Sequence, residues 1–184
     1  MQPPGAQRTY LLNQVEFAFQ LRRLLQENAQ WTREVMLLSA AEGGDAEAAL
    51  QRLGRNVQEM SGLVRQMYGE RTAAQFDGIL NVQNNLVVEM IDAIKANDTQ
   101  RLNELNIQAY AVADNAADFI SGLNSSFDRN EFRVIFYDLA YMIENEAMQI
   151  LSGRYAESIA QYDRIVDRMM TMADDIIFTV IRQV

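Results

Sequence analysis

Two amide side chains occupy positions where the surrounding pattern calls for apolar residues. Asn28 and Gln83 fall at the same point of two successive repeats of about 55 residues, and Leu139 takes that point in the third repeat. Amides that face an interior hydrogen-bond each other, a backbone carbonyl, water or a ligand. Two interpretations follow. Either the amides fix helix register, as a buried asparagine does in coiled coils, or they line a small polar cavity.

Three glutamates could add carboxylates to such a polar cavity. Glu34 and Glu89 follow the two amides by six residues, and Glu146 falls on the apolar face of the third repeat. An ionised carboxylate at an interior position needs a partner such as an arginine, or else a raised pKa. The sequence therefore predicts an interior polar cluster that consists of Asn28, Gln83, Glu34, Glu89 and Glu146.

The composition excludes most familiar catalytic and metal chemistry. The 184 residues contain no cysteine and no histidine, which removes disulfides, zinc and haem sites of the usual kinds and Ser-His-Asp triads. A metal site would have to consist of oxygen ligands alone, and no glycine-rich phosphate loop occurs. We therefore expect a protein that is not an enzyme and that uses no metal or other cofactor.

Charge and hydropathy narrow the choice of partners. A formal charge of -9 argues against nucleic acid as a partner. No apolar run reaches the roughly 18 to 20 residues that a membrane span needs. No secretory signal is visible near the first residues, so the expected location is cytoplasmic, with non-classical export as an open alternative.

The spacing of apolar residues predicts helices along almost the whole chain. Prolines occur only at positions 3 and 4, and apolar residues recur at intervals of three and four, as on one face of an α-helix. Asp45, Asp98 and Asp128 are the predicted N-caps. Residues typical of helix ends divide the chain into six segments at Gly43-Gly44, Tyr68-Gly69, Asn97-Asp98, Asn124-Ser125-Ser126 and Ser152-Gly153.

The six segments are three copies of one helical hairpin. The even-numbered segments share one apolar spacing, seen in Leu50, Leu53, Val57, Met60, Val64, Met67, in Leu102, Leu105, Ala109, Val112, Ala116, Phe119, and in Ile159, Tyr162, Val166, Met169, Ala173, Ile176. One hairpin cannot bury such a face alone. The predicted fold class is all-α, an antiparallel helical bundle of about six helices built from three helical-hairpin repeats. The alternative is a four-helix bundle with long helices, joined end to end through Gly69.

Residues 1–9 are expected to form a flexible segment and residues 10–184 a single domain.

Both ends of the chain carry more apolar side chains than one helix face requires. This excess predicts a protein that acts through self-association or protein docking, as a subunit of a homo-oligomer or polymer. Two alternatives stay open: the two ends pack on each other within one subunit, and the bundle binds a small ligand in a polar cavity. The candidate interface residues are Tyr10, Leu11, Leu12, Phe17, Phe19, Phe178 and Ile181.

Several short motifs occur along the chain in the order and at the spacing of a known family. They include Trp31-Thr32-Arg33, Leu53-Gly54-Arg55-Asn56, Lys95-Ala96-Asn97-Asp98, Glu144-Asn145-Glu146-Ala147, Gly153-Arg154-Tyr155 and Ile181-Arg182-Gln183. Through them the sequence resembles a family of small all-helical proteins from Gram-positive, often spore-forming bacteria, some of which are labelled acetylglutamate kinase. The resemblance implies a helical fold and no activity. A kinase of that kind needs a nucleotide-binding α/β sheet, which the helical pattern excludes. Family members carry histidines where this chain has Asn28, Gln83 and Leu139, so imidazole chemistry at those positions is not implied.

Overall fold

The computed structural model describes residues 4–41 and 44–181, with the side chains of residues 13–41 and 44–181. The described residues contain no strand, and the prediction of an all-α bundle of about six helices is confirmed. The four-helix alternative is wrong, because the chain turns at Gly69, whose φ of 82° ends one helix and starts the next. The helices are α1 (Pro4–Ala40), α2 (Glu47–Tyr68), α3 (Glu70–Lys95), α4 (Thr99–Leu123), α5 (Arg129–Leu151) and α6 (Tyr155–Ile181).

Side-chain caps start two of the helices. The Asp98 carboxylate accepts a hydrogen bond from the backbone N–H of Arg101 at 2.9 Å, at the start of α4. The Asp128 carboxylate accepts from the backbone N–H groups of Asn130 and Glu131 at 2.7 and 3.1 Å, at the start of α5. These bonds satisfy amide donors that have no partner within the helix.

The remaining helix ends also follow local chemistry. Asp45 precedes α2 and accepts a hydrogen bond from the backbone N–H of Glu47 at 3.0 Å. Asn97 and Gly153 lie just beyond α3 and α5 with φ values of 54° and 74°. This left-handed conformation stops a helix and turns the chain, and asparagine and glycine are the residues that adopt it most readily.

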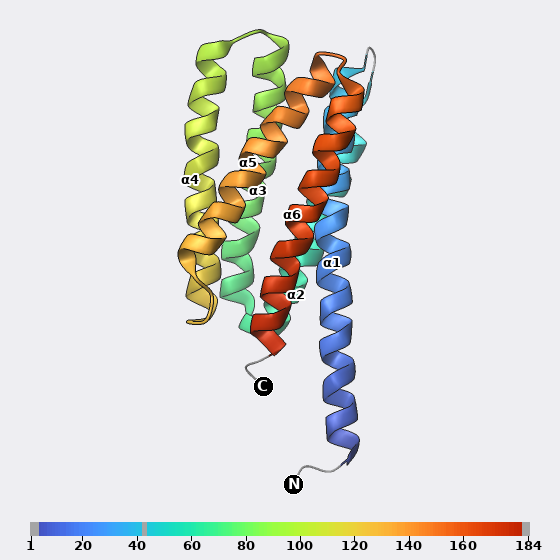
Figure 1. Ribbon diagram of the computed structural model, residues 1–184, viewed down its shortest axis with the longest axis vertical. Helices are drawn as coiled ribbons and strands as arrows, with labels where there is room; N and C mark the ends of the chain where they lie inside the picture. The colour runs from blue at the N-terminus through green and yellow to red at the C-terminus, as the bar shows by residue number, and fades with distance from the viewer. Residues whose placement is uncertain (1–3, 42–43, 182–184) are drawn as a thin grey trace.

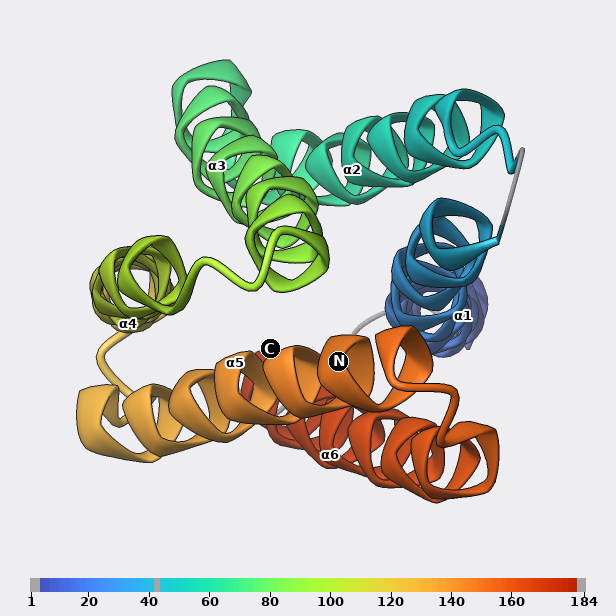
Figure 2. The same cartoon turned by 90° about the horizontal axis from the view of Figure 1, so that it is seen from above.

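The six helices surround a central axis, as Figure 2 shows from above. Each helix packs against its neighbour in the chain, and α1 also packs against α6, which closes the ring. The odd-numbered helices α1, α3 and α5 contact one another across the middle as well. Successive helices run in opposite directions along the bundle (Figure 1). The three hairpins are thus α1 with α2, α3 with α4 and α5 with α6.

Side chains that point toward the axis form the hydrophobic core. One large cluster of buried residues draws on all six helices. A smaller cluster joins α3 to α4 through Leu86, Met90, Ala93 and Leu105. Burial of apolar side chains at about 25 cal/mol per Å² is the main stabilising contribution in a bundle of this kind.

The buried face of α6 departs from the prediction at its start. Ile159, which was predicted to face the interior, is 54% exposed, whereas Ser158 is fully buried. The hydroxyl and the carbonyl oxygen of Ser158 accept hydrogen bonds from Arg33 on α1, both at 3.1 Å. The prediction was wrong at Ile159 because apolar spacing carries no information about a donor on another helix.

Helix α1 is longer than the others, with 37 residues against 27 in α6. At about 1.5 Å per residue its length is roughly 55 Å, against roughly 40 Å for α6. Its first turns project beyond the rest of the bundle (Figure 1). It begins at Pro4, within the segment 1–9 that the sequence predicted to be flexible. Neither α1 nor any other described helix is long and apolar enough to cross a membrane.

The Asp128 cap yields a test of how α5 starts. Replacing Asp128 with alanine removes both cap hydrogen bonds and is expected to lower the free energy of unfolding by about 0.5–2 kcal/mol in urea titrations. Asp128→Asn is the matched control, since asparagine caps equally well and should leave stability within about 0.5 kcal/mol of the wild type. Equal losses in the two variants would contradict the capping role.

Candidate functional site: a cavity at the centre of the bundle

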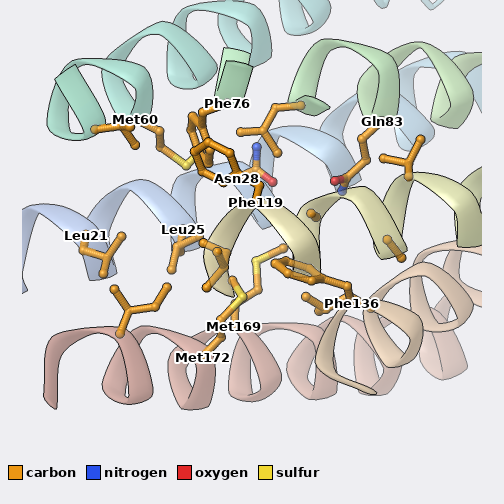
Figure 3. Close-up of a pocket in the computed structure, with 18 of the residues that line it drawn as sticks. Leu21, Leu25, Asn28, Met60, Phe76, Gln83, Phe119, Phe136, Met169 and Met172 are labelled. Carbon is orange, nitrogen blue, oxygen red and sulfur yellow. The ribbon is translucent and has the colours of Figure 1, made fainter. Parts of the chain in front are cut away.

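A cavity of about 160 Å³ lies among the helices and is lined by side chains from all six of them. Figure 3 shows part of the lining, with Leu21 and Leu25 from α1, Met60 from α2 and Met169 and Met172 from α6. Most of the lining is apolar. The space is therefore a hydrophobic cavity, in contrast to the small polar cavity of the second interpretation of the sequence.

The three equivalent positions of the repeats all lie on this cavity. Asn28 on α1, Gln83 on α3 and Leu139 on α5 belong to its lining. The odd-numbered helices contact one another across the centre, so positions at the same point of each repeat approach the same space. Figure 3 shows the amide end of Gln83 directed toward Asn28. Two amides from two repeats thus face one cavity.

Asn28 is held in place by a partner that the sequence reasoning did not identify. Its amide nitrogen donates a hydrogen bond of 3.1 Å to the side-chain oxygen of Asn56 on α2. The amide nitrogen of Asn56 in turn donates at 2.9 Å to the carbonyl oxygen of Leu24. Asn28 and Asn56 are both buried. This chain of hydrogen bonds fixes α1 against α2 and supports the register interpretation for Asn28.

Gln83 differs from Asn28 in its surroundings. It is half-buried on α3, and no hydrogen bond joins its amide to another residue in the part of the chain that the structure describes. Its amide is not among the fully buried side-chain groups of the described residues that lack a hydrogen-bond partner, so it keeps some open space beside it. Gln83 is therefore available to hydrogen-bond a molecule inside the cavity.

The walls of the cavity combine aromatic rings with flexible thioethers. The rings of Phe76 on α3 and Phe119 on α4 lie with their centroids 5.7 Å apart and their planes tilted by 37°. Methionine side chains adapt to irregular shapes and make favourable sulfur–aromatic contacts. No charged residue belongs to the lining among the described residues. The labelled wall residues in Figure 3 include Met60, Phe76, Phe119, Phe136, Met169 and Met172.

The three carboxylates of the predicted polar cluster do not line this cavity. A residue six positions along a helix lies about 120° around it, so Glu34 and Glu89 face away from the amides that they follow. Glu89 is exposed and pairs with Arg101 on α4, while Glu34 is half-buried. Glu146 follows Leu139 by seven residues, which keeps the face but shifts it about 10 Å along the axis. The predicted cluster is therefore not one site.

Glu146 forms a separate buried ion pair. Its side chain is 2% exposed and accepts a hydrogen bond from Arg33, whose side chain is 14% exposed. Arg33 also donates to the carbonyl and hydroxyl oxygens of Ser158. The Arg33 guanidinium lies 5.3 Å from the centre of the Tyr162 ring. One side chain of α1 thus links α5 and α6, and the partner that Glu146 needs is an arginine, as the sequence suggested.

The ion pair perturbs two titratable groups. Burial raises the pKa of Glu146, although the hydrogen bond and the charge of Arg33 act to lower it. Burial also raises the pKa of Tyr162, with the charge of Glu146 adding to the effect. Because the folded pKa of Glu146 exceeds the unfolded one, its contribution to stability is fully present below the ordinary glutamate pKa. That contribution is lost as the pH rises through the folded value.

Two functional residues, Asn56 and Arg33, were not found by sequence reasoning. Asn56 directly precedes Val57, which belongs to the predicted apolar face of the second segment. Its position beside that face was the available signal, because a residue there lies close to the interior. Arg33 lies in the piece Trp31-Thr32-Arg33 that carries the family resemblance, but no local pattern names its partner, because the choice among the arginines depends on how the helices pack.

The candidate interface residues separate into three groups. Phe17 and Ile181 are half-buried and pack against the hydrophobic core of their own chain. Phe19 and Phe178 are 72% and 61% exposed. Their exposure keeps the docking hypothesis open for those two residues. The side chains of Tyr10, Leu11 and Leu12 lie outside the described residues.

The buried ion pair yields a test of stability. Arg33→Met leaves the Glu146 carboxylate buried without its cation and is expected to cost roughly 3–5 kcal/mol of unfolding free energy near neutral pH. Adding Glu146→Met should recover most of the loss, because the double variant has no unpaired charge buried between α1 and α5. Arg22→Met breaks the half-exposed pair with Asp174 and serves as the control, with an expected loss of at most about 1 kcal/mol.

The same variants report on the pKa of Glu146. Without Arg33 that pKa rises further, so the deficit of Arg33→Met relative to the wild type should shrink as the pH falls from about 7 to about 5. Denaturant titrations of the wild type and of Arg33→Met at both pH values measure this difference in unfolding free energy. A deficit that grows at the lower pH, or a double variant less stable than Arg33→Met alone, would contradict this account.

Comparison with known proteins leaves the site to be interpreted from its geometry. No protein-family model matches the chain, and no curated protein and no solved structure matches it. The resemblance to helical proteins of Gram-positive bacteria therefore stays a prediction from the sequence.

Proposed function

We propose that this protein is a non-enzymatic bundle that binds a small, neutral, mostly apolar molecule in its central cavity. The observation that carries the proposal is the cavity of about 160 Å³ with apolar walls and the amides of Asn28 and Gln83. In another protein, a dry apolar cavity of about 150 Å³ takes up benzene. A space of this size suits a ligand with one or two rings or a short branched chain.

The small side chains of the lining support a role for the open space. Three alanines of α4, at positions 109, 113 and 116, and Ala140 of α5 line the cavity. Larger apolar residues there would reduce it. An empty cavity costs about 24 cal/mol per Å³, which for this volume is on the order of 4 kcal/mol. A bound molecule would offset that cost by restoring contacts with the walls.

The absence of charged residues from the described lining limits the ligand to neutral molecules. A carboxylate or an ammonium group inside the cavity would lose its hydration without gaining an ion-pair partner. The two amides offer hydrogen bonds to a neutral polar group instead. Binding of this kind needs no reactive side chain, which agrees with a protein that is not an enzyme.

Filling the cavity tests this proposal. Toluene and indole, each in large excess, are expected to raise the melting temperature of the wild type by several degrees, because ligand at about 100 times its Kd adds about 2.7 kcal/mol. Ala113→Leu and Ala140→Leu, on two different helices of the lining, should abolish the shift. The exposed Ala111→Leu on α4 is the control and should keep it. No shift in the wild type, or an undiminished shift in both filled variants, would overturn the proposal.

Self-association is the second candidate function, and two exposed rings favour it. Arg22 on α1 pairs with Asp174 on the antiparallel α6. Phe19 lies about one turn before Arg22, and Phe178 about one turn after Asp174, so the two rings fall at the same level of neighbouring helices. Both are more than half exposed. An apolar patch of this kind is typical of an interface between protein subunits.

Analytical ultracentrifugation over a range of concentrations tests the second candidate. The wild type is expected to form dimers or larger species at high concentration, and Phe19→Gln with Phe178→Gln should shift it to monomer. Ile107 on α4 is 71% exposed, and Ile107→Gln serves as the control that leaves the assembly unchanged. A wild type that stays monomeric at the highest concentration would rule this candidate out.

A further inference from the structure

The Gln83 amide is one of the polar side chains on the cavity wall, together with Asn28 and Tyr68. It lies on the wall of an apolar space, and no hydrogen bond joins it to another described residue. Asn28, at the equivalent position of the first repeat, is bound to Asn56 at 3.1 Å. Leu139, at the equivalent position of the third repeat, is apolar and buried. Of the three equivalent positions, the one on α3 therefore carries the amide that is free to meet a ligand.

The direction of the Gln83 side chain agrees with this role. Its amide end extends from α3 toward Asn28 and into the space between the helices (Figure 3). A glutamine amide both donates and accepts hydrogen bonds. It can therefore pair with a hydroxyl group, which also does both, and the site would distinguish such a ligand from an apolar molecule of the same shape.

The walls indicate the shape of the ligand. Phe76 and Phe119 present tilted rings, and Phe136 on α5 adds a third aromatic side chain to the lining. Met60, Met169 and Met172 bring flexible thioethers to the space. Aromatic molecules suit such a lining, because ring edges pack against ring faces and because sulfur makes favourable contacts with rings. The volume of about 160 Å³ fits one or two rings.

From these observations we infer that Gln83 determines ligand specificity and that the ligand class is a neutral aromatic molecule with one hydrogen-bonding group, such as a hydroxyl. This inference rests on the proposed function, since it concerns the same cavity. The ring occupies the apolar space, and the hydroxyl donates to the Gln83 oxygen or accepts from its nitrogen. Asn28 also lines the cavity while its amide nitrogen remains bonded to Asn56.

Phenol and toluene are the matched pair of ligands that test it, because they have nearly the same shape and differ in a hydroxyl against a methyl group. The quantity to measure, by calorimetry or by ligand-detected NMR, is the ratio of the toluene Kd to the phenol Kd. In Gln83→Leu this ratio is expected to fall roughly 5- to 100-fold, because the hydroxyl loses its partner. Gln75→Leu makes the same exchange at an exposed position of the same helix, outside the cavity, and it should keep the wild-type ratio.

Thermal unfolding without ligand separates a specificity role from a structural one. Gln83→Leu should be at least as stable as the wild type, since it removes an amide that has no partner among the described residues. A large loss of stability would instead assign Gln83 to the packing of the protein and overturn the inference. An unchanged Kd ratio in Gln83→Leu would also overturn it, while toluene binding would still support the proposed function. Failure of both phenol and toluene to bind the wild type would overturn the two proposals together.

Discussion

The contact between α1 and α6 is the constraint on which the rest of the structure depends. Each of the three hairpins has apolar residues on both of its helices and cannot cover them by itself. Packing the first helix against the last closes the ring. With the ring closed, each hairpin covers its neighbours, and the odd-numbered helices enclose a common centre. Arg22 on α1 pairs with Asp174 on α6 across this contact.

A buried arginine adds geometric definition that apolar contacts lack. The attraction between apolar side chains is non-directional, whereas a guanidinium has donors in fixed directions. Arg33 meets the Glu146 carboxylate on α5 and two oxygens of Ser158 on α6. The removal of both charges from water is costly, so the pair contributes little net stability. The pair fixes the positions of α1, α5 and α6 relative to one another. It lies at a different level of the bundle axis from the cavity.

The cavity and the tightly packed regions follow from the same arrangement. Six helices around one axis leave more space at the centre than four do, and the alanines of α4 keep part of that space open. The Asn28–Asn56 hydrogen bonds hold α1 to α2 at the cavity wall. Contacts at the cavity wall and away from it therefore hold the helices around this space. Ligand binding in a preformed cavity then needs little rearrangement.

The sequence by itself determined the helical class, most of the helix boundaries and the repeated hairpin, because these depend on interactions between residues close together in the chain. The turn at Gly69, which gives six helices and not four, was settled only by the structure. Caps such as Asp98 and Asp128 act within three residues, and the apolar period reports one helix face at a time. The sequence also pointed to Asn28 and Gln83 as interior amides. Only the tertiary structure decided their different roles, since the partner of Asn28 lies on α2 and Gln83 meets the cavity. It likewise decided that Arg33 pairs with Glu146, 113 residues away, because helix packing brings together side chains that no local pattern relates.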